Sequence, residues 1–209
     1  MRLTILTGKF MTTMDERLLG YYLACEDSEA GPWNRSPRSL YIEYWTRAFI
    51  AGRIRPFSGM QVCNVGIGAG GWDNFLCDLL DGIGRVTSVD IDRGICELFR
   101  YRQEREGHRN PSTVVCADIL TDSLTASSFD VVTVIGSTVR ESGNYSGCLS
   151  SCWRLVRNGG FMMYMDFFRT PSEQFEAWAA SGGAVIEEYA QDNTVSGYAS
   201  WVRREDSVG

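Results

Sequence analysis

The sequence predicts an α/β protein: a doubly wound, mostly parallel seven-stranded sheet with an antiparallel C-terminal strand and an N-terminal helical lid. From Met60 onward, short apolar runs alternate with segments of helical periodicity, as parallel strands joined by crossover helices do. The last two strand-like runs are joined only by Ala190–Gly197. Because that connection is too short for a helical crossover, the pair should be antiparallel. Residues 1–59 follow neither pattern and are dense in aromatic side chains.

Apolar and β-branched runs predict the seven strands. They cover Met60–Val65, Arg85–Val89, Thr113–Cys116, Phe129–Ile135, Phe161–Met165, Ala184–Tyr189 and Tyr198–Arg203. Apolar residues at helical spacing predict the helices between them, which cover Trp72–Leu80, Arg93–Glu106, Tyr145–Val156 and Ser172–Ser181. Asn158-Gly159-Gly160 follows the third of these helices and is typical of a helix C-terminus.

Residues 1–59 are expected to form a helical lid that caps the site, and residues 60–209 to form the core of one structural domain. Ser39–Arg53 is a predicted helix, and Ser28–Arg38, which contains Gly31 and two prolines, is a predicted loop. The aromatic side chains of this region either close over the carboxyl edge of the sheet or pack the first helix onto it. Both interpretations stay open at this point.

Composition narrows the classes of partner. The net charge is −6, Lys9 is the only lysine, and no basic tract occurs, so nucleic-acid binding is not favoured. The seven cysteines include no C-x-x-C pair, which favours a reduced, cytoplasmic protein. No apolar run is long enough for a membrane helix. We therefore expect a small-molecule partner and no membrane; a homodimer is compatible with the sequence.

A glycine-rich turn is the first feature that indicates a ligand-binding site. Val65-Gly66-Ile67-Gly68-Ala69-Gly70-Gly71 follows the first strand and opens a helix, so a ligand can approach the backbone closely. This turn alone is ambiguous, because Gly66, Gly68 and Gly71 also satisfy the G-x-G-x-x-G pattern of dinucleotide-binding proteins.

Two carboxylates end the next two strands. Asp90 can accept hydrogen bonds from both hydroxyls of a ribose. Asp118 can accept one from an adenine amino group, while Ile91 and Ile119 cover the ring faces. The alternatives are an ordinary strand-end residue for Asp90 and a turn or helix-cap residue for Asp118.

This ordered set resembles the class I S-adenosylmethionine-dependent methyltransferases over roughly residues 60–203. The resemblance includes the glycine turn, Asp90, Ala117-Asp118, Phe129-Asp130-Val131-Val132 and the closing hairpin, and Leu155–Phe161 is similar to the family's L-x-P-G-G turn. It implies S-adenosylmethionine as the cofactor and S-adenosylhomocysteine as its product. The candidate cofactor-binding residues are Asn64, Gly66, Gly68, Gly70, Asp90, Ile91, Asp118, Ile119 and Gly136. Asn64 is a departure, because the family often has Asp or Glu there.

The resemblance further implies methyl transfer to a small molecule. We favour an amine slightly, since no general base stands out, and we expect no metal. The candidate catalytic residues are Tyr22, Ser137 and Arg140, and the candidate acceptor-binding residues are Tyr21, Trp33, Tyr44 and Asp166. Arg140 either holds an acceptor carboxylate or is a solvated loop residue. The only histidine, His108, is expected at the opposite edge of the sheet.

Three other functions remain open. The first is O-methylation of a small natural product. The second is an aminopropyltransferase-like activity, which is disfavoured because Gly136-Ser137 follows the fourth strand where that family supplies an aspartate. The third is a protein that binds S-adenosylmethionine without transferring its methyl group.

Overall fold

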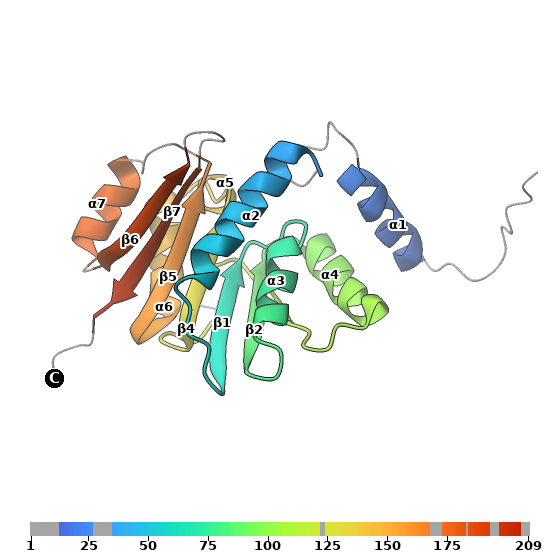
Figure 1. Cartoon of the computed structure of the whole chain (residues 1–209), viewed down its shortest axis with the longest axis horizontal. Coiled ribbons are helices and arrows are strands. Elements are labelled where there is room, and N and C mark those ends of the chain that lie inside the picture. Colours follow the sequence, from blue (N-terminus) through green and yellow to red (C-terminus); the bar gives the residue numbers. More distant parts are fainter. Residues whose placement is uncertain are drawn as a thin grey trace, which may run out of the picture.

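The computed structural model describes residues 13–26, 35–121, 124–167, 173–182, 184–192 and 197–205. They form one seven-stranded sheet of order β3-β2-β1-β4-β5-β7-β6 (Figure 1). The strands are β1 (Met60–Val65), β2 (Gly84–Asp90), β3 (Thr113–Cys116), β4 (Phe129–Ile135), β5 (Val156–Asp166), β6 (Ala184–Asp192) and β7 (Gly197–Arg204). Strands β1 to β5 pair in parallel, and β7 is antiparallel to β5 and β6. The predicted fold class is confirmed.

Helices cover both faces of this sheet (Figure 1). They are α1 (Thr13–Glu26), α2 (Pro37–Ala51), α3 (Gly71–Leu79), α4 (Arg93–Glu106), α5 (Thr138–Glu141), α6 (Tyr145–Leu155) and α7 (Glu173–Ser181). Side chains of β5 alternate between the faces, because successive strand residues point in opposite directions. Met162 and Tyr164 join the core under α6 and α7, whereas Met163 and Met165 join the core under α2 and α3.

The two N-terminal helices pack in different ways. Helix α2 buries Phe49 and Ile50 in the same cluster as Val62, Leu76 and Trp201, so it belongs to the main core of the sheet. Helix α1 packs on α4 instead, at the other end of the molecule from α7 (Figure 1). Sequence reasoning treated both as one lid region and predicted no separate helix over Thr13–Glu26.

The connection into β5 differs from the prediction. Helix α6 ends at Leu155 and β5 begins at once at Val156, so the Asn158-Gly159-Gly160 segment lies inside the strand and is not a helix-ending turn. The register against β4 shifts between Phe129 and Val131, which marks a bulge. Gly159 has φ +71°, a conformation that suits glycine at such a site.

Two other segments qualify the predicted organisation. The described residues between β3 and β4 form turns and no helix, so the crossover between these two strands has no helix among its described residues. Pro37 and Arg38 belong to α2 rather than to the predicted loop. Most of that loop, with Trp33, lies outside the described residues. No helix in the described ranges is both long and apolar enough to cross a membrane.

Candidate active site

The glycine turn joins β1 to α3 at the carboxyl edge of the sheet. Gly66, Gly68 and Gly70 have φ values of +89°, +51° and +71°, so all three occupy the left-handed region. An added Cβ at Gly68 would meet nothing within 4 Å. At Gly66 it would collide with the Thr138 side chain. The turn thus exposes bare backbone at Gly68 and packs tightly at Gly66.

Asp90 is fixed beside this turn. Its Oδ2 accepts the backbone N–H of Ile67 at 2.8 Å, and the amide nitrogen of Gly68 lies 3.4 Å from the same oxygen. Its Oδ1 accepts the N–H of Asp92 at 2.9 Å. A carboxylate oxygen can accept more than one hydrogen bond, so each oxygen retains accepting capacity for a ligand hydroxyl. Asp90 therefore lies directly beside the glycine turn.

Beneath the turn lies a buried polar network that contains Asn64. Its Nδ2 donates to both carboxylate oxygens of Asp73 and to the Gly66 carbonyl, each at 3.0 Å. Its Oδ1 accepts the Thr133 hydroxyl at 2.9 Å. Because these bonds use both ends of a buried amide, Asn64 supports the turn from below and is not directed at a cofactor, contrary to its predicted role.

Sequence reasoning missed Asp73, which lies fully buried in the first turn of α3. Burial raises the pKa of its carboxyl group to about 7, although hydrogen bonds from Ser88 and Asn64 act in the opposite direction. The available signal was an acidic residue in the first turn of the helix that the glycine turn opens. Its burial could not be read from the sequence.

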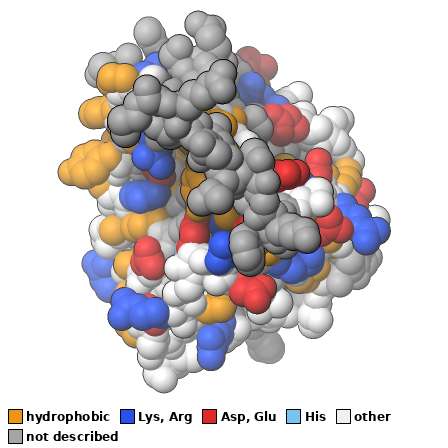
Figure 2. Space-filling view, turned by 90° about the vertical axis from the view of Figure 1, so that its right-hand side faces the viewer, with side chains coloured by type: hydrophobic (Ala, Val, Ile, Leu, Met, Phe, Trp, Pro, Cys, Tyr) orange, Lys and Arg blue, Asp and Glu red, His pale blue; other side chains and the backbone are white. Residues whose placement is uncertain are grey.

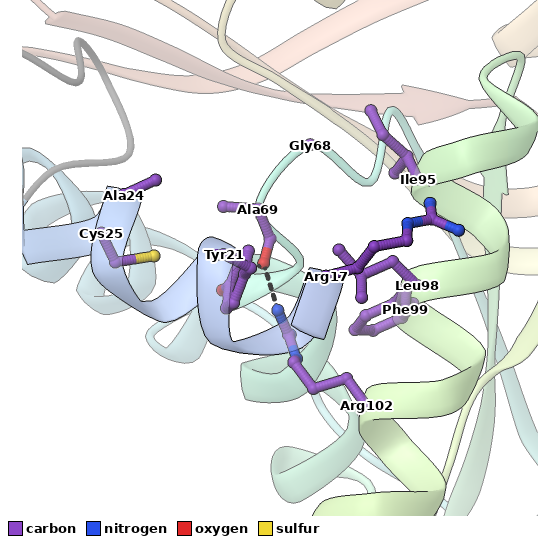
Figure 3. Close-up of a pocket in the computed structure, with 11 residues that line it drawn as sticks. Arg17, Tyr21, Ala24, Cys25, Gly68, Ala69, Ile95, Leu98, Phe99 and Arg102 are labelled. Atoms are coloured by element: carbon purple, nitrogen blue, oxygen red, sulfur yellow. Dashed lines mark hydrogen bonds between the residues drawn. The ribbon is translucent and has the colours of Figure 1, made fainter. Parts of the chain in front are cut away.

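The outer side of the turn is held by Arg102 of α4 and Tyr21 of α1 (Figure 3). The Arg102 guanidinium donates to the Ala69 carbonyl at 2.6 Å and to the Gly70 carbonyl at 3.3 Å. The Tyr21 hydroxyl donates to the same Ala69 oxygen at 2.7 Å. Arg102 is only 4% exposed, and its guanidinium also lies over the Tyr21 ring, 4.7 Å from the centroid. Tyr21 therefore contacts the turn.

Between α1, α4 and the turn lies a pocket of about 380 Å³ (Figure 3). Its walls are mainly apolar and include Ala24, Gly68, Ile95 and Leu98. The cationic and acidic side chains visible on this side of the molecule are intermingled and form no single-sign patch there (Figure 2). The pocket therefore suits a small, largely apolar group better than a polyanion.

The candidate adenine-binding residues lie at the ends of β2 and β3. Ile91 is 69% exposed and stands at the edge as predicted. Asp118 accepts the N–H of Leu120 at 2.9 Å through one carboxylate oxygen, so it shapes the turn after β3 as the alternative interpretation stated. Ile119 is buried in the core under α6, so its packing does not suit the predicted role of covering a ring.

A second cluster forms where β4 and β5 end. Asp166 is buried and ion-paired with Arg140 at 3.1 Å. It also accepts the Tyr164 hydroxyl at 2.8 Å, and the Tyr164 and Tyr145 hydroxyls lie 2.6 Å apart. The structure thus brings Arg140 and Asp166 together, but as partners of each other, which neutralises the arginine charge that was expected to bind an acceptor carboxylate.

The backbone between these strands approaches the glycine turn. Gly136 has φ +80° and donates its N–H to the Met165 carbonyl at 2.8 Å. Ser137 is the N-terminal cap residue of α5, although its side chain makes no capping bond. Thr138, one residue further, packs against Gly66. Gly136 and Ser137 therefore lie near the glycine turn.

The remaining candidates lie apart from this cluster. Tyr22 hydrogen-bonds Glu106 at the end of α4. Helix α4 packs on β2 and β3, on the far side of β1 from the loops after β4 and β5, so Tyr22 is not brought to Ser137 or Arg140. Tyr44 projects from α2 and is 71% exposed. His108 follows α4 and contacts Glu106 at 2.9 Å, at the edge opposite the glycine turn.

Comparison with known proteins identifies the domain. Residues 62–160 match the family model described as a methyltransferase domain. The ubiquinone/menaquinone biosynthesis C-methyltransferase UbiE of Coxiella burnetii is 26% identical over 129 residues, which are 62% of this chain and 51% of that protein. This chain thus spans about half the length of the curated relatives it matches.

Solved structures agree in fold. A SAM-dependent methyltransferase from Aquifex aeolicus superposes with a TM-score of 0.64 at 12% identity, covering 75% of this chain and 88% of that one. The [4+2]-cyclase SpnF superposes with a TM-score of 0.69 at 12% identity, covering 83% of this chain and 85% of that one. The CurJ carbon methyltransferase superposes with a TM-score of 0.67 at 14% identity, covering 87% of this chain and 59% of that one.

These findings support the predicted resemblance. Residues 62–160 match a methyltransferase domain, and the chain has the fold of the solved S-adenosylmethionine-dependent methyltransferases, which supports S-adenosylmethionine as the cofactor. Neither the acceptor nor the site residues follow from the match. Among the described residues, no group of three or more His, Cys, Asp or Glu side chains could hold a metal ion.

Proposed function

We propose that this chain transfers the methyl group of S-adenosylmethionine to a small-molecule acceptor and releases S-adenosylhomocysteine. The observation that carries the proposal is the glycine turn at the carboxyl edge of β1, joined to the Asp90 carboxylate by the 2.8 Å bond from the Ile67 amide. The match of residues 62–160 to a methyltransferase domain supports it.

The residues present fit this cofactor. Gly68 leaves open space beside its backbone, and Asp90 has accepting capacity for ribose hydroxyls. Exposed Ile91 offers an apolar surface to an adenine ring, and Asp118 lies in the turn after the neighbouring strand β3. When bound, the cofactor supplies an electrophilic methyl group on a sulfonium. The chain's own residues then need only to bind, orient and exclude water from the acceptor.

We place the acceptor at the loops after β4 and β5. Arg140, Asp166 and Tyr164 form a connected polar wall there, and Gly136 contributes backbone without a side chain. Burial raises the pKa of Tyr164 well above its usual range, so its hydroxyl keeps its proton and donates it in a hydrogen bond to Asp166. This wall can orient an acceptor by hydrogen bonds.

We propose an amine as the acceptor group. A phenol or carbon acid must lose a proton to become nucleophilic, and the groups of this wall are poorly suited to remove one: Asp166 is ion-paired and the tyrosine hydroxyl is protonated. A neutral amine already carries its lone pair and releases its proton to solvent after transfer. Positioning alone is therefore sufficient for an amine.

Methyl transfer to carbon is the second candidate. It is favoured by the likeness to UbiE and CurJ, which are both carbon methyltransferases. The likeness to SpnF, a [4+2]-cyclase, shows in addition that this fold also occurs in proteins described by another reaction. A test therefore has to separate cofactor binding from turnover, and turnover on nitrogen from turnover on carbon.

The test begins with calorimetry of S-adenosylhomocysteine binding to the full chain and to an Asp90→Ala variant. Turnover is then measured as S-adenosylhomocysteine release with panels of amines, phenols and activated carbon acids, using cofactor with a labelled methyl group. Label recovered on nitrogen supports the proposal. Label on carbon replaces it with the second candidate. Binding without any turnover across the panels would contradict methyl transfer.

A further inference from the structure

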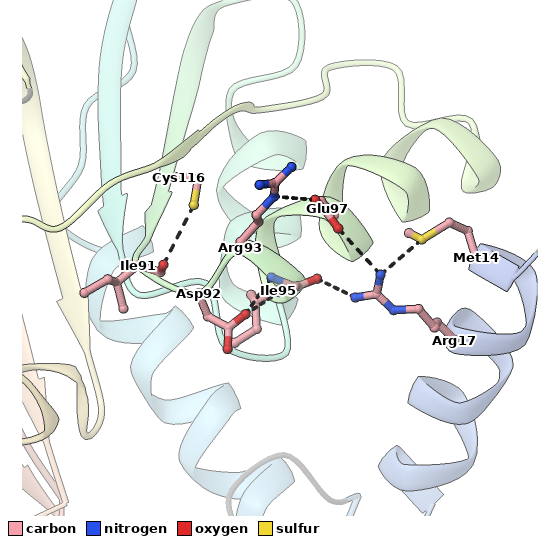
Figure 4. A network of polar contacts seen from close by, with 9 residues as sticks. Met14, Arg17, Ile91, Asp92, Arg93, Ile95, Glu97 and Cys116 are labelled. Carbon is pink, nitrogen blue, oxygen red and sulfur yellow. Dashed lines mark hydrogen bonds and ion pairs between the residues drawn. The ribbon is translucent and has the colours of Figure 1, made fainter.

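Two cysteines lie side by side at the edge where β2 and β3 end. Cys96 is in the first turn of α4, and its sulfur lies 3.5 Å from the Asp90 carbonyl oxygen. Cys116 is the last residue of β3, and its sulfur lies 3.8 Å from the Ile91 carbonyl oxygen (Figure 4). The Cys96 sulfur also lies 3.9 Å from the carbonyl oxygen of Val115, the residue before Cys116. Both sulfurs therefore lie against the same short stretch of backbone at the ends of β2 and β3.

This pair differs from the other cysteines in access to solvent. Cys116 is exposed, whereas Cys96 is fully buried directly behind it. The other five thiols are buried. Cys148 and Cys152 also contact each other, one turn apart on α6, but neither offers a surface to a dissolved oxidant. Only the pair at the end of β3 combines an accessible thiol with a second thiol in reach.

We propose that Cys96 and Cys116 form a reversible disulfide that weakens cofactor binding. The oxidant is a peroxide. It transfers one oxygen to the Cys116 thiol, which becomes a sulfenic acid as the rest of the peroxide leaves as water or an alcohol. The Cys96 sulfur then attacks the Cys116 sulfur, the S–S bond forms, and the hydroxyl leaves as water with the proton from Cys96. A dithiol reductant reverses the reaction.

The order of these steps follows from burial. Desolvation raises the pKa of the Cys96 thiol to about 12, with a further contribution from its neighbour Cys116. Reaction with an oxidant requires a thiolate that solvent can reach, so Cys116 is oxidised first.

The site of the disulfide links it to the proposed cofactor cleft. Asp90 pairs with Cys116 in the register of β2 and β3, and both sulfurs lie against the carbonyl groups of Asp90 and Ile91. An S–S bond of about 2.0 Å draws the sulfurs away from those carbonyls. We expect the end of β2 to shift with them and the affinity for the cofactor to fall by about fivefold or more.

The experiment has two independent readouts on the full chain. After treatment with hydrogen peroxide, the protein is alkylated and analysed by intact mass and by mapping of cross-linked peptides. We expect two fewer alkylatable thiols and one Cys96–Cys116 cross-link that a dithiol removes. Calorimetry with S-adenosylhomocysteine should show weaker binding after oxidation and recovery after reduction. A Cys116→Ser variant should respond in neither assay, whereas a Cys25→Ser control should respond in both.

The outcomes separate the parts of the proposal. No cross-link, or a cross-link between other cysteines, overturns the disulfide site. A Cys96–Cys116 cross-link with unchanged affinity overturns its effect on the cofactor. The affinity readout rests on the proposed function, but the cross-link does not. Failure of the reduced protein to bind S-adenosylhomocysteine would therefore reject cofactor binding, but it would leave the disulfide proposal standing.

Discussion

Replacement of Arg102 by methionine tests whether the glycine turn is held in place from outside. The substitution keeps an unbranched apolar stem but removes the bonds to the Ala69 and Gly70 carbonyls. Both carbonyls keep another donor, since Tyr21 bonds Ala69 and the backbone N–H of Asn74 bonds Gly70. The substitution therefore lowers stability through the lost charge-assisted hydrogen bonds, and it leaves neither carbonyl without a donor.

We expect the free energy of unfolding of the Arg102→Met variant to be about 2 kcal/mol lower, because a hydrogen bond to a charged group contributes about 1.5–3 kcal/mol. For a chain of this size that corresponds to a fall in Tm of roughly 4–8 °C. A looser turn should also raise the Kd for S-adenosylhomocysteine about tenfold, or about 1.4 kcal/mol. Thermal unfolding and calorimetry measure the two effects separately.

Arg105→Met provides the matched control. Arg105 lies three residues after Arg102 on α4, is largely exposed, and pairs with Asp15 of α1 at 3.2 Å. It should remove one exposed ion pair while leaving the bonds of Arg102 and Tyr21 to the turn in place, with little effect on Kd. Arg102→Lys, which keeps the charge without the planar fork, should recover only part of the affinity. Loss of stability with unchanged Kd in Arg102→Met would refute the argument that the clamp shapes the cofactor site.

Other substitutions probe the turn and the network beneath it. Asp90→Ala should weaken cofactor binding by about 1.5–3 kcal/mol in calorimetry, and unchanged affinity would remove this residue from the site. Gly68→Ala should lower the melting temperature modestly, because alanine is strained at φ +51°, and should reduce cofactor affinity. Gly66→Ala should lower the melting temperature further, because its Cβ also collides with Thr138. The carboxyl group of Asp73 has its pKa raised from 3.8 to about 7, so the folded state holds this proton more tightly than the unfolded chain does. Its contribution to stability should therefore fall as pH rises from about 4 to about 7 and level off above that. Asp73→Asn should flatten this part of the pH profile in denaturant titrations, and an unchanged profile would contradict the assignment.

Parts of the site were predictable because they depend on local chain geometry. Glycines between a strand and a helix predicted the turn, and all three that were named as cofactor contacts adopt positive φ. Asp90 was predictable as well, since the carboxyl ends of parallel strands meet at one edge of a sheet. Its bond to the Ile67 amide follows from that topology.

Other roles depended on partners that are distant in the sequence. Asn64 looked like a cofactor contact because it precedes the turn, yet Asp73 and Thr133 use its amide in the core. Arg140 looked like an anion site because Asp166, which neutralises it, comes from a different strand. A single sequence does not reveal such pairings, since either side chain alone is compatible with solvent.

The alternation of strands and helices from Met60 onward, the antiparallel closing pair and the resemblance to methyltransferases were all predictable, because these depend on periodicity, turn residues and motif spacing. Which polar groups are satisfied internally, and which face the site, depends on the packing of the folded chain. Burial and long-range contact set the charge state of Asp73, the clamp formed by Arg102 and the meeting of Cys96 with Cys116. These properties arise between elements, where local sequence carries no signal.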